Sequence, residues 1–430
     1  RNNLSARVFE ETLPPERRAR ECAVIWLRMS EGIDAFAFAH RTGYELDGLF
    51  HDVLPRLIDE EWMAWNTYKV PRVVDKLSTE YFAVRSGCSV MDLTPMEKYR
   101  ISGPDAYAYL DRLVTRDLSK LRPGRVTYVI WCNDEGKVID DGTLFQLADN
   151  DYRLCAQHHQ LDWLEISAAG FDVDIRVETH DIAALAVQGP TSYSVLKSAG
   201  IDGLEDLRPF GVADLACGDV PVMVSRTGYT GDLGYELWMS LDDALAVWDA
   251  IFAVQGRYDI HAMGLSALEM VRIEAGFIMP GFDFNTAEAT IRSGYDRSPY
   301  EVGLGWVVSL DKGHFTGRKA LLAEKARPPA RRLEKIVIEG NKPVGEAFIY
   351  AGKNGRQIGE IKCATWSPIL KENVALADIQ YVGGRLPGDL WARIDYQREL
   401  KWHSTWARCD VRDKPFYTPE HRSVTPPARF

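Results

Sequence analysis

The stretch SRTGYTGDLGYELWM, residues 225–239, joins a glycine-rich turn to the start of a strand. Gly228, Gly231 and Gly234 fall within seven residues, which indicates a backbone that comes close to another group, such as a ligand. The strand after the turn holds a single acid, Glu236, among apolar neighbours. Because the segment runs into a strand, it does not fit the dinucleotide-binding fingerprint, which requires GxGxxG between a strand and a helix.

Glu236 allows two interpretations. In the simpler one, it is an exposed acid in a glycine-rich hairpin. In the other, its two carboxylate oxygens accept parallel hydrogen bonds from a planar heterocycle with adjacent N–H donors, such as a pterin or a guanine. The spacing alone does not decide between these alternatives.

Composition limits the possible classes of protein. A chain of 430 residues with 46% hydrophobic residues predicts two or three globular domains. The 62 acidic residues exceed the 51 basic ones, which argues against nucleic acid as a partner. We expect no membrane span, because no apolar run approaches eighteen residues.

The cysteine and histidine patterns concern the compartment and metal binding. Seven scattered cysteines without a CxxC pair predict reduced thiols in a cytoplasmic protein, and they argue against a zinc site. The adjacent pair His158 and His159 lacks a third metal ligand nearby, so we predict no metal centre.

The order of patterns along the chain predicts an α+β fold in three parts. Residues 1–60 are charged and have helical spacing, so we interpret them as an N-terminal helical extension. Residues 61–325 mix strands and helices and form the predicted α+β body. The stretch AEKARPPARRLE, residues 323–334, is typical of a linker. Short strands then fill residues 326–430 and predict a small antiparallel barrel or sandwich.

A second informative stretch is NDEGKVIDDGTLFQL, residues 133–147. Its first four residues predict a hairpin turn, and Asp140 and Asp141 follow on the next strand. Neighbours on a strand face opposite sides, so only one of the two acids can point into a pocket. The simpler interpretation places both at the surface. The functional one is that a buried carboxylate with a raised pKa handles a proton.

Together these stretches resemble the folate-dependent aminomethyltransferase family, typified by the glycine-cleavage T-protein. The likeness covers roughly residues 62–420, with fragments in the same order and with similar gaps. They are SVMDLTPM (89–96), LRPGRVTYVIWCNDEGKVIDD (121–141), AVQGP (186–190), SRTGYTGDLGYEL (225–237), VRIEAGF (271–277), EVGLGWVVSLDK (301–312) and QIGEIKCATWSPILKENVALA (357–377).

The resemblance implies a three-domain, cloverleaf-like fold with a C-terminal β-barrel domain and with tetrahydrofolate in the central opening. It places Asp141 near N5 of the folate, as the catalytic residue, and Glu236 on the amide and amino edge of the pterin. It also implies further folate-lining positions: Met96, Tyr128, Tyr229 and Trp306.

Two departures bear on the substrate. Leu268 stands where the T-protein has an arginine, which argues against a plain T-protein. The segment 285–305 and its end, SPYEVGLGW, look more like the demethylase branch, which includes dimethylsulfoniopropionate demethylase and tetrahydrofolate-dependent O-demethylases. The aromatic O-demethylases have a histidine where this chain has Thr94 and Pro95.

We therefore predict an enzyme that moves a methyl group from a small sulfonium or quaternary-ammonium donor to N5 of tetrahydrofolate. The alternatives are an aromatic O-demethylase, a glycine-cleavage-type aminomethyltransferase, and a folate-binding module without catalysis. The sequence does not determine the oligomeric state.

Overall fold

The computed structural model describes residues 62–429 except 67, 291–293, 328–329, 343, 346 and 399. The predicted helical extension, residues 1–60, lies outside the described residues. Residues 64–430 form one compact unit. Two short strands, β1 (Trp62–Trp65) and β2 (Tyr68–Pro71), precede the first described helix.

A five-stranded antiparallel sheet follows the order β5-β6-β7-β4-β8. Gly136, with φ of +72°, closes the turn between β5 and β6 at the predicted hairpin. The core of this part is built on Tyr99, Trp131 and Leu144 under two helices. The elements are β4 (Glu97–Ser102), β5 (Arg125–Cys132), β6 (Val138–Ala148), β7 (Asp151–Ala156), β8 (Asp174–Val177), α6 (Ala106–Leu113) and α7 (Leu161–Ser167).

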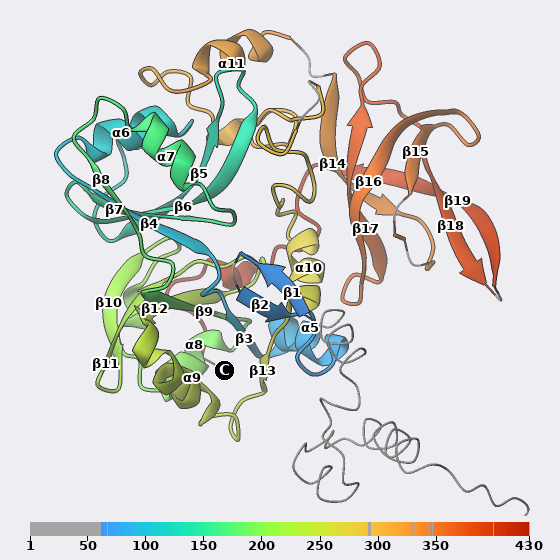
Figure 1. Ribbon diagram of the computed structural model, residues 1–430. Helices are drawn as coiled ribbons and strands as arrows, with labels where there is room; N and C mark the ends of the chain where they lie inside the picture. Colours follow the sequence, from blue (N-terminus) through green and yellow to red (C-terminus); the bar gives the residue numbers. More distant parts are fainter. Residues whose placement is uncertain are drawn as a thin grey trace, which may run out of the picture. The chain divides into compact units, whose positions relative to one another are not determined.

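A six-stranded sheet follows the order β10-β11-β12-β9-β3-β13. Strand β3 comes early in the chain yet lies between the late strands β9 and β13, so the two sheets are interleaved in sequence (Figure 1). The strands are β3 (Cys88–Asp92), β9 (Ile182–Gln188), β10 (Val212–Cys217), β11 (Val220–Ser225), β12 (Gly234–Ser240) and β13 (Ile260–Ala262). The helices are α5 (Leu77–Ser86), α8 (Ser192–Ser198), α9 (Ala244–Phe252) and α10 (Leu265–Glu274).

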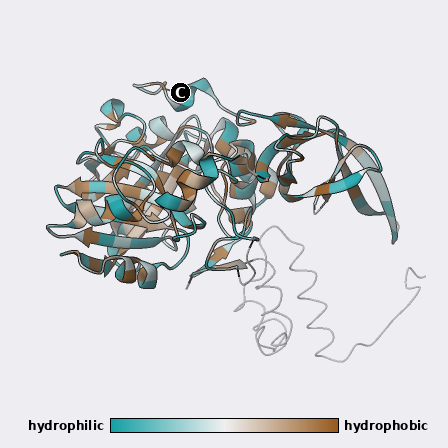
Figure 2. Cartoon of the chain, turned by 90° about the horizontal axis from the view of Figure 1, so that it is seen from above, coloured by the Kyte–Doolittle hydropathy of each residue, from teal (hydrophilic) through white to brown (hydrophobic). Residues whose placement is uncertain are grey.

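The two sheets meet across a shared apolar cluster. Phe145 of the five-stranded sheet and Trp238 of the six-stranded sheet pack edge to face, with ring centres 5.2 Å apart. Leu268 of α10 and Tyr81 of α5 belong to the same cluster. Brown and teal residues alternate along the strands in Figure 2, as expected when one face of a strand is buried.

Six strands close the C-terminal barrel in the order β14-β17-β16-β15-β18-β19. Because these strands form a closed barrel, the sandwich alternative is excluded. The α+β class with a C-terminal barrel is confirmed. The predicted linker at 323–334 is wrong in part, because helix α11 (Arg318–Lys325) and β14 take up its ends. The strands are β14 (Arg331–Ile338), β15 (Phe348–Ala351), β16 (Arg356–Ser367), β17 (Glu372–Gln380), β18 (Leu390–Arg398) and β19 (Lys401–Arg412).

The division into residues 1–60, 61–325 and 326–430 stays a prediction. Short 3-10 turns complete the described elements: η1 (Leu204–Asp206), η2 (Leu241–Asp243), η3 (Gly305–Val307) and η4 (Glu420–Arg422). Within the described part of the chain, no helix is both long and apolar enough to cross a bilayer. The six described cysteines are free thiols.

Candidate active site

The glycines of residues 225–239 make room for protein side chains. A Cβ atom at Gly228 or Gly234 would lie 2.0 or 2.2 Å from Oε1 of Gln188. At Gly231, whose φ is +75°, it would lie 2.5 Å from Cβ of Ala275. The expected close approach is therefore real, but the groups approached are Gln188 and Ala275, and the structure gives no support to the idea that these glycines face a ligand.

Gln188, at the end of β9, holds both arms of the turn. Its Nε2 donates hydrogen bonds to the carbonyls of Thr227 and Tyr235, each at 3.2 Å. The hydroxyl of Thr230 donates to its Oε1 at 2.9 Å. These hydrogen bonds hold the two arms of the turn together at the start of β12, the strand that carries Glu236.

Glu236 lies in the middle of β12, opposite Ser225 on β11 and Ala186 on β9. Glu236 is 8% exposed, and the hydroxyl of Thr227 donates a hydrogen bond to its Oε2 at 2.5 Å. Among the described residues, no lysine, arginine or histidine forms an ion pair with this carboxylate. Burial raises its pKa, and the bond from Thr227 offsets only part of that effect. The exposed-hairpin interpretation of Glu236 is therefore wrong.

Asp140 and Asp141 on β6 have different partners, as the alternation of a strand requires. Asp140 is fully buried, and its Oδ1 accepts the backbone N–H of Asp141 at 2.9 Å. The hydroxyl of Tyr128 on β5 donates to Oδ2 of Asp141 at 2.5 Å. Burial, reinforced by the neighbouring Asp140 carboxylate, raises the pKa of Asp141 to about 8. A pKa in this range suits a group that exchanges a proton near neutral pH.

Aromatic side chains extend outward from Asp141. The ring of Tyr128 stacks on Trp306, with centres 6.1 Å apart and an interplanar angle of 23°. Trp306 is 66% exposed, and the Arg116 guanidinium lies 5.5 Å from its ring centre. The half-buried carboxylate of Asp141 thus lies at the inner end of an aromatic stack whose outer ring, Trp306, is exposed.

Tyr229, in the turn, stacks on Phe277, with ring centres 5.4 Å apart, and its hydroxyl donates to the carbonyl of Ile278. Met96 and Tyr229 pack against the apolar cluster that contains Leu268. Leu268 is buried there, so the position at which the T-protein resemblance implies an arginine is apolar in this chain.

Burial also raises the pKa of two other groups in this part of the protein. Burial raises the pKa of Tyr128 well above its usual value, with further contributions from Asp141 and Tyr229. Burial also raises the pKa of Cys155 on β7 to about 12, and the Glu236 carboxylate adds to that rise. Glu236 and Asp141 belong to different sheets, the six-stranded and the five-stranded sheet respectively.

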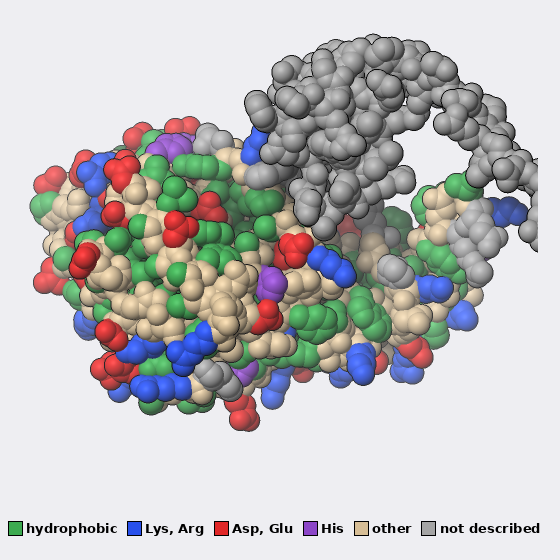
Figure 3. All heavy atoms as spheres, turned by 90° about the horizontal axis from the view of Figure 1, so that it is seen from below, with side chains coloured by type: hydrophobic (Ala, Val, Ile, Leu, Met, Phe, Trp, Pro, Cys, Tyr) green, Lys and Arg blue, Asp and Glu red, His purple; other side chains and the backbone are tan. Residues whose placement is uncertain are grey.

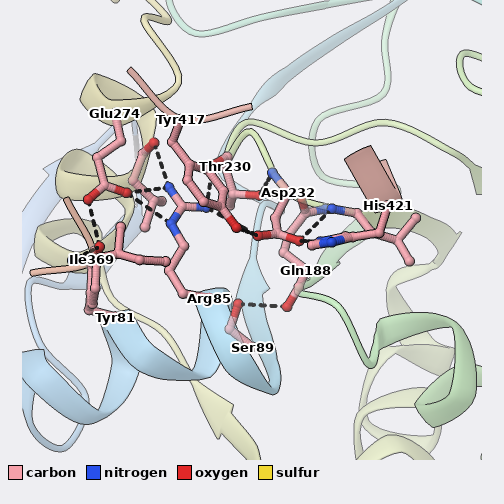
Figure 4. A network of polar contacts seen from close by, with 12 residues as sticks. Tyr81, Arg85, Ser89, Gln188, Thr230, Asp232, Glu274, Ile369, Tyr417 and His421 are labelled. Atoms are coloured by element: carbon pink, nitrogen blue, oxygen red, sulfur yellow. Dashed lines mark hydrogen bonds and ion pairs between the residues drawn. The ribbon is translucent and has the colours of Figure 1, made fainter. Parts of the chain in front are cut away.

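Behind the turn lies a buried polar network that the sequence interpretation missed (Figure 4). Arg85 on α5 makes an ion pair with Glu274 on α10 at 2.6 Å and contacts Asp232 at 3.5 Å. It also donates to the carbonyl of Thr230 at 3.0 Å. Ser367, at the end of β16, donates to Glu274 at 2.5 Å and so joins the barrel to the network.

The C-terminal segment completes this network. His421 and Tyr417 bind opposite oxygens of Asp232, at 2.6 and 3.1 Å. Arg226 in turn donates to the carbonyls of Arg422 and Val424. The stretch PFYTPEH, residues 415–421, consists of coil and the start of a 3-10 turn, and it braces the loop that carries Thr230 and Asp232. The closely spaced aromatic and histidine residues of this stretch were the sequence signal for these polar contacts.

The described residues contain no group of three His, Cys, Asp or Glu side chains arranged to hold a metal. On the face shown in Figure 3, acidic and basic side chains are interspersed over the described surface. The candidate site consists of two separated carboxylates, those of Asp141 and Glu236, and the aromatic side chains described above.

This architecture and the sequence define the family. Residues 58–312 match the family described as the GCVT N-terminal domain, and the chain belongs to it. It is 37% identical over 346 residues to a trimethylamine-oxide aldolase from Ruegeria pomeroyi, covering 77% of this chain. The match spans only 42% of that relative's length.

Two further relatives are aminomethyltransferases. The protein from Thermotoga petrophila is 32% identical over 347 residues, covering 77% of this chain and 92% of the relative. The crystal structure of glycine cleavage system aminomethyltransferase T from Bartonella henselae superimposes with a TM-score of 0.71 at 23% identity. The superposition covers 85% of this chain and 97% of that one. The predicted aminomethyltransferase fold is confirmed, and the relatives are enzymes of this family.

Proposed function

We propose that this chain binds tetrahydrofolate and transfers to its N5 a methyl group taken from a small methylated donor. The observation that carries the proposal is Glu236, a buried carboxylate with no basic partner among the described residues. Such a group is costly unless hydrogen-bond donors are supplied. A ligand with two adjacent N–H groups would supply them.

The residues present suit tetrahydrofolate. Glu236 would accept the amide and amino hydrogens at the edge of the pterin, with one hydrogen bond for each carboxylate oxygen. Aromatic and thioether side chains suit the flat parts of the ligand. Those proposed to line it are Met96, Tyr128, Tyr229 and Trp306.

Asp141 would accept the proton that leaves N5. In the transfer, a bond forms between N5 and the methyl carbon while the bond from that carbon to the donor heteroatom breaks. The electron pair of the broken bond stays on the heteroatom. A raised pKa suits Asp141 to hold the proton, and the hydrogen bond from Tyr128 orients it. The remaining contribution of the chain is alignment and exclusion of water.

A sulfonium or quaternary-ammonium donor fits this site better than an aryl ether. An onium heteroatom leaves as a neutral group and needs no proton donor, and Asp141 is assigned to the opposite task. Leu268 removes the arginine of the aminomethyltransferase pattern and leaves an apolar surface. A relative named for trimethylamine oxide also supports a small methylated nitrogen compound.

The second candidate is aminomethyl transfer as in glycine cleavage. The near-complete coverage of the Thermotoga petrophila aminomethyltransferase favours it, whereas Leu268 argues against it. Both candidates need the same folate site and differ in the donor.

A donor panel tests the proposal. The protein is incubated with tetrahydrofolate and, separately, a sulfonium propionate, a betaine, trimethylamine oxide, a methoxybenzoate and an aminomethyl-lipoyl carrier. Chromatography of the folates identifies the product. 5-Methyltetrahydrofolate from an onium donor supports the proposal, and the same product from the methoxybenzoate alone makes the donor class wrong. Formation of 5,10-methylenetetrahydrofolate with the lipoyl carrier alone selects the second candidate.

A further inference from the structure

His158 contacts Asp140, the acid that precedes Asp141 on β6. It follows β7, and its side chain is 39% exposed. Its Nδ1 lies 3.4 Å from Oδ2 of Asp140, and its backbone N–H donates to the same oxygen at 3.4 Å. The other oxygen of Asp140 accepts the backbone N–H of Asp141. One histidine ring therefore reaches the buried acid next to the proposed proton acceptor.

The surroundings make His158 the counter-charge of the acid pair. Within the described residues, the ion pair of Asp140 is the one with His158. The charged groups that face the ring are Asp140 and Asp141 from β6 and Glu288 from the segment after Phe284. These three groups are acidic. Gly281 lies beside the ring, where a Cβ would make ordinary van der Waals contact at 3.6 Å from Cε1 and Nε2.

We propose that His158 is a positioning residue whose positive charge stabilises ionised Asp140 and thereby sets the proton affinity of Asp141. A role of the His158–Asp140 pair in catalysis rests on the proposed role of Asp141. Adjacent carboxylates titrate as a pair, in which each negative charge disfavours the other. A cation at one of them lowers the upper apparent pKa of the pair. The hydrogen bond to Asp140 raises the pKa of His158, in keeping with a charged ring.

The chain supplies a matched control. His159 is the next residue and 58% exposed, but its Nδ1 lies 3.7 Å from Glu97. Its partner is a different acid, on β4. His159→Gln therefore changes the same chemistry without removing the charge beside Asp140.

The test is a titration of the ligand-free protein labelled with ¹³C at aspartate carboxyls. Asp140→Asn and Asp141→Asn assign the two signals. His158→Gln should raise the upper apparent pKa of the pair by about one unit or more, the order expected for a lost charge a few ångströms away. His159→Gln should leave it unchanged, and His158→Arg, which keeps a charge, should leave it at or below the original value.

An unchanged titration in His158→Gln, or an equal shift in His159→Gln, would overturn the proposal. The pH profile of turnover provides the second readout, and its ascending limb should move to higher pH in His158→Gln in step with the titration. A protein that shows the titration shift but no tetrahydrofolate-dependent turnover would retain the electrostatic role while contradicting the proposed function.

Discussion

The hydroxyl of Tyr128 reaches diagonally across the β5–β6 pair to the carboxylate of Asp141. Tyr128 is registered opposite Thr143, and Asp141 is opposite Ile130, so the two residues are diagonal neighbours. A long aromatic side chain can span that separation on one face of a sheet. The bond at 2.5 Å stabilises the ionised carboxylate against the effects of burial and of Asp140.

Tyr128→Phe removes this donor and should raise the pKa of Asp141 further. A hydrogen bond to a charged group contributes about 1.5–3 kcal/mol, which corresponds to a shift of about 1–2 pKa units. The acid limb of the turnover profile should move to higher pH by that amount, with little change in folate affinity. Stopped or continuous assays between pH 6 and 10 measure it. A profile identical to that of the unchanged protein would contradict the assignment.

Asp141→Asn should stabilise the ligand-free protein in a pH-dependent way. The pKa of Asp141 is raised from its ordinary value to about 8 in the folded protein. Its contribution to the free energy of unfolding is therefore greatest at acid pH, where the carboxyl is protonated in both the folded and the unfolded state. The unfolded state ionises first, so this effect is lost as the pH rises from about 4 to 8. The gain in melting temperature from Asp141→Asn should therefore grow across that range and level off above it. Melting curves at pH 5, 7 and 9 test this, and a constant difference would count against a raised pKa.

Glu236→Gln should weaken tetrahydrofolate binding by tenfold or more. Loss of the charged acceptor of two hydrogen bonds costs about 2–4 kcal/mol. The ligand-free protein should melt no lower than before, since the buried charge is removed. Calorimetric titration measures the affinity, and Asp214→Asn, an exposed acid on β10 of the same sheet, is the control. Equal affinity for Glu236→Gln and the unchanged protein would remove Glu236 from the folate site.

Gly228→Ala should destabilise the fold through Gln188. The new methyl group would lie 2.0 Å from Oε1, so the side chain must move and its bonds to the turn are lost. Overpacking of this kind costs about 1–3 kcal/mol. Gly256→Ala is the control, because a Cβ there meets nothing within 4 Å. In a Gln188→Ala background the cost of Gly228→Ala should shrink, as chemical denaturation of the four proteins of the cycle would show.

Arg85→Met should destabilise the protein strongly, because Glu274 would stay buried without its cation and Asp232 would keep only His421 as a basic partner. Breaking a buried ion pair from one side costs about 3–5 kcal/mol. Lys197→Met is the matched control, since Lys197 pairs with Asp202, whose side chain is 90% exposed. Its cost should be below about 1 kcal/mol. Similar unfolding midpoints for the two variants would show that the Arg85 network contributes little.

Local patterns in the sequence determined the hairpin at residues 133–147, the strand that carries Glu236, and the β-rich C-terminal part. These features depend on turn chemistry and on the alternation of neighbouring residues, both of which are readable within a dozen positions. The alternation also separates Asp140 from Asp141, which the structure shows with different partners.

Tertiary structure alone decided which groups meet. Arg85 and Glu274 are 189 residues apart in the chain, and Gln188 lies 39 residues before the carbonyl of Thr227 that it holds. Closure of the barrel and the pairing of His158 with Asp140 depend in the same way on packing between distant segments. Side-chain periodicity specifies which face of an element is buried, but the partner on the other side is selected by the shape and charge of the assembled interior.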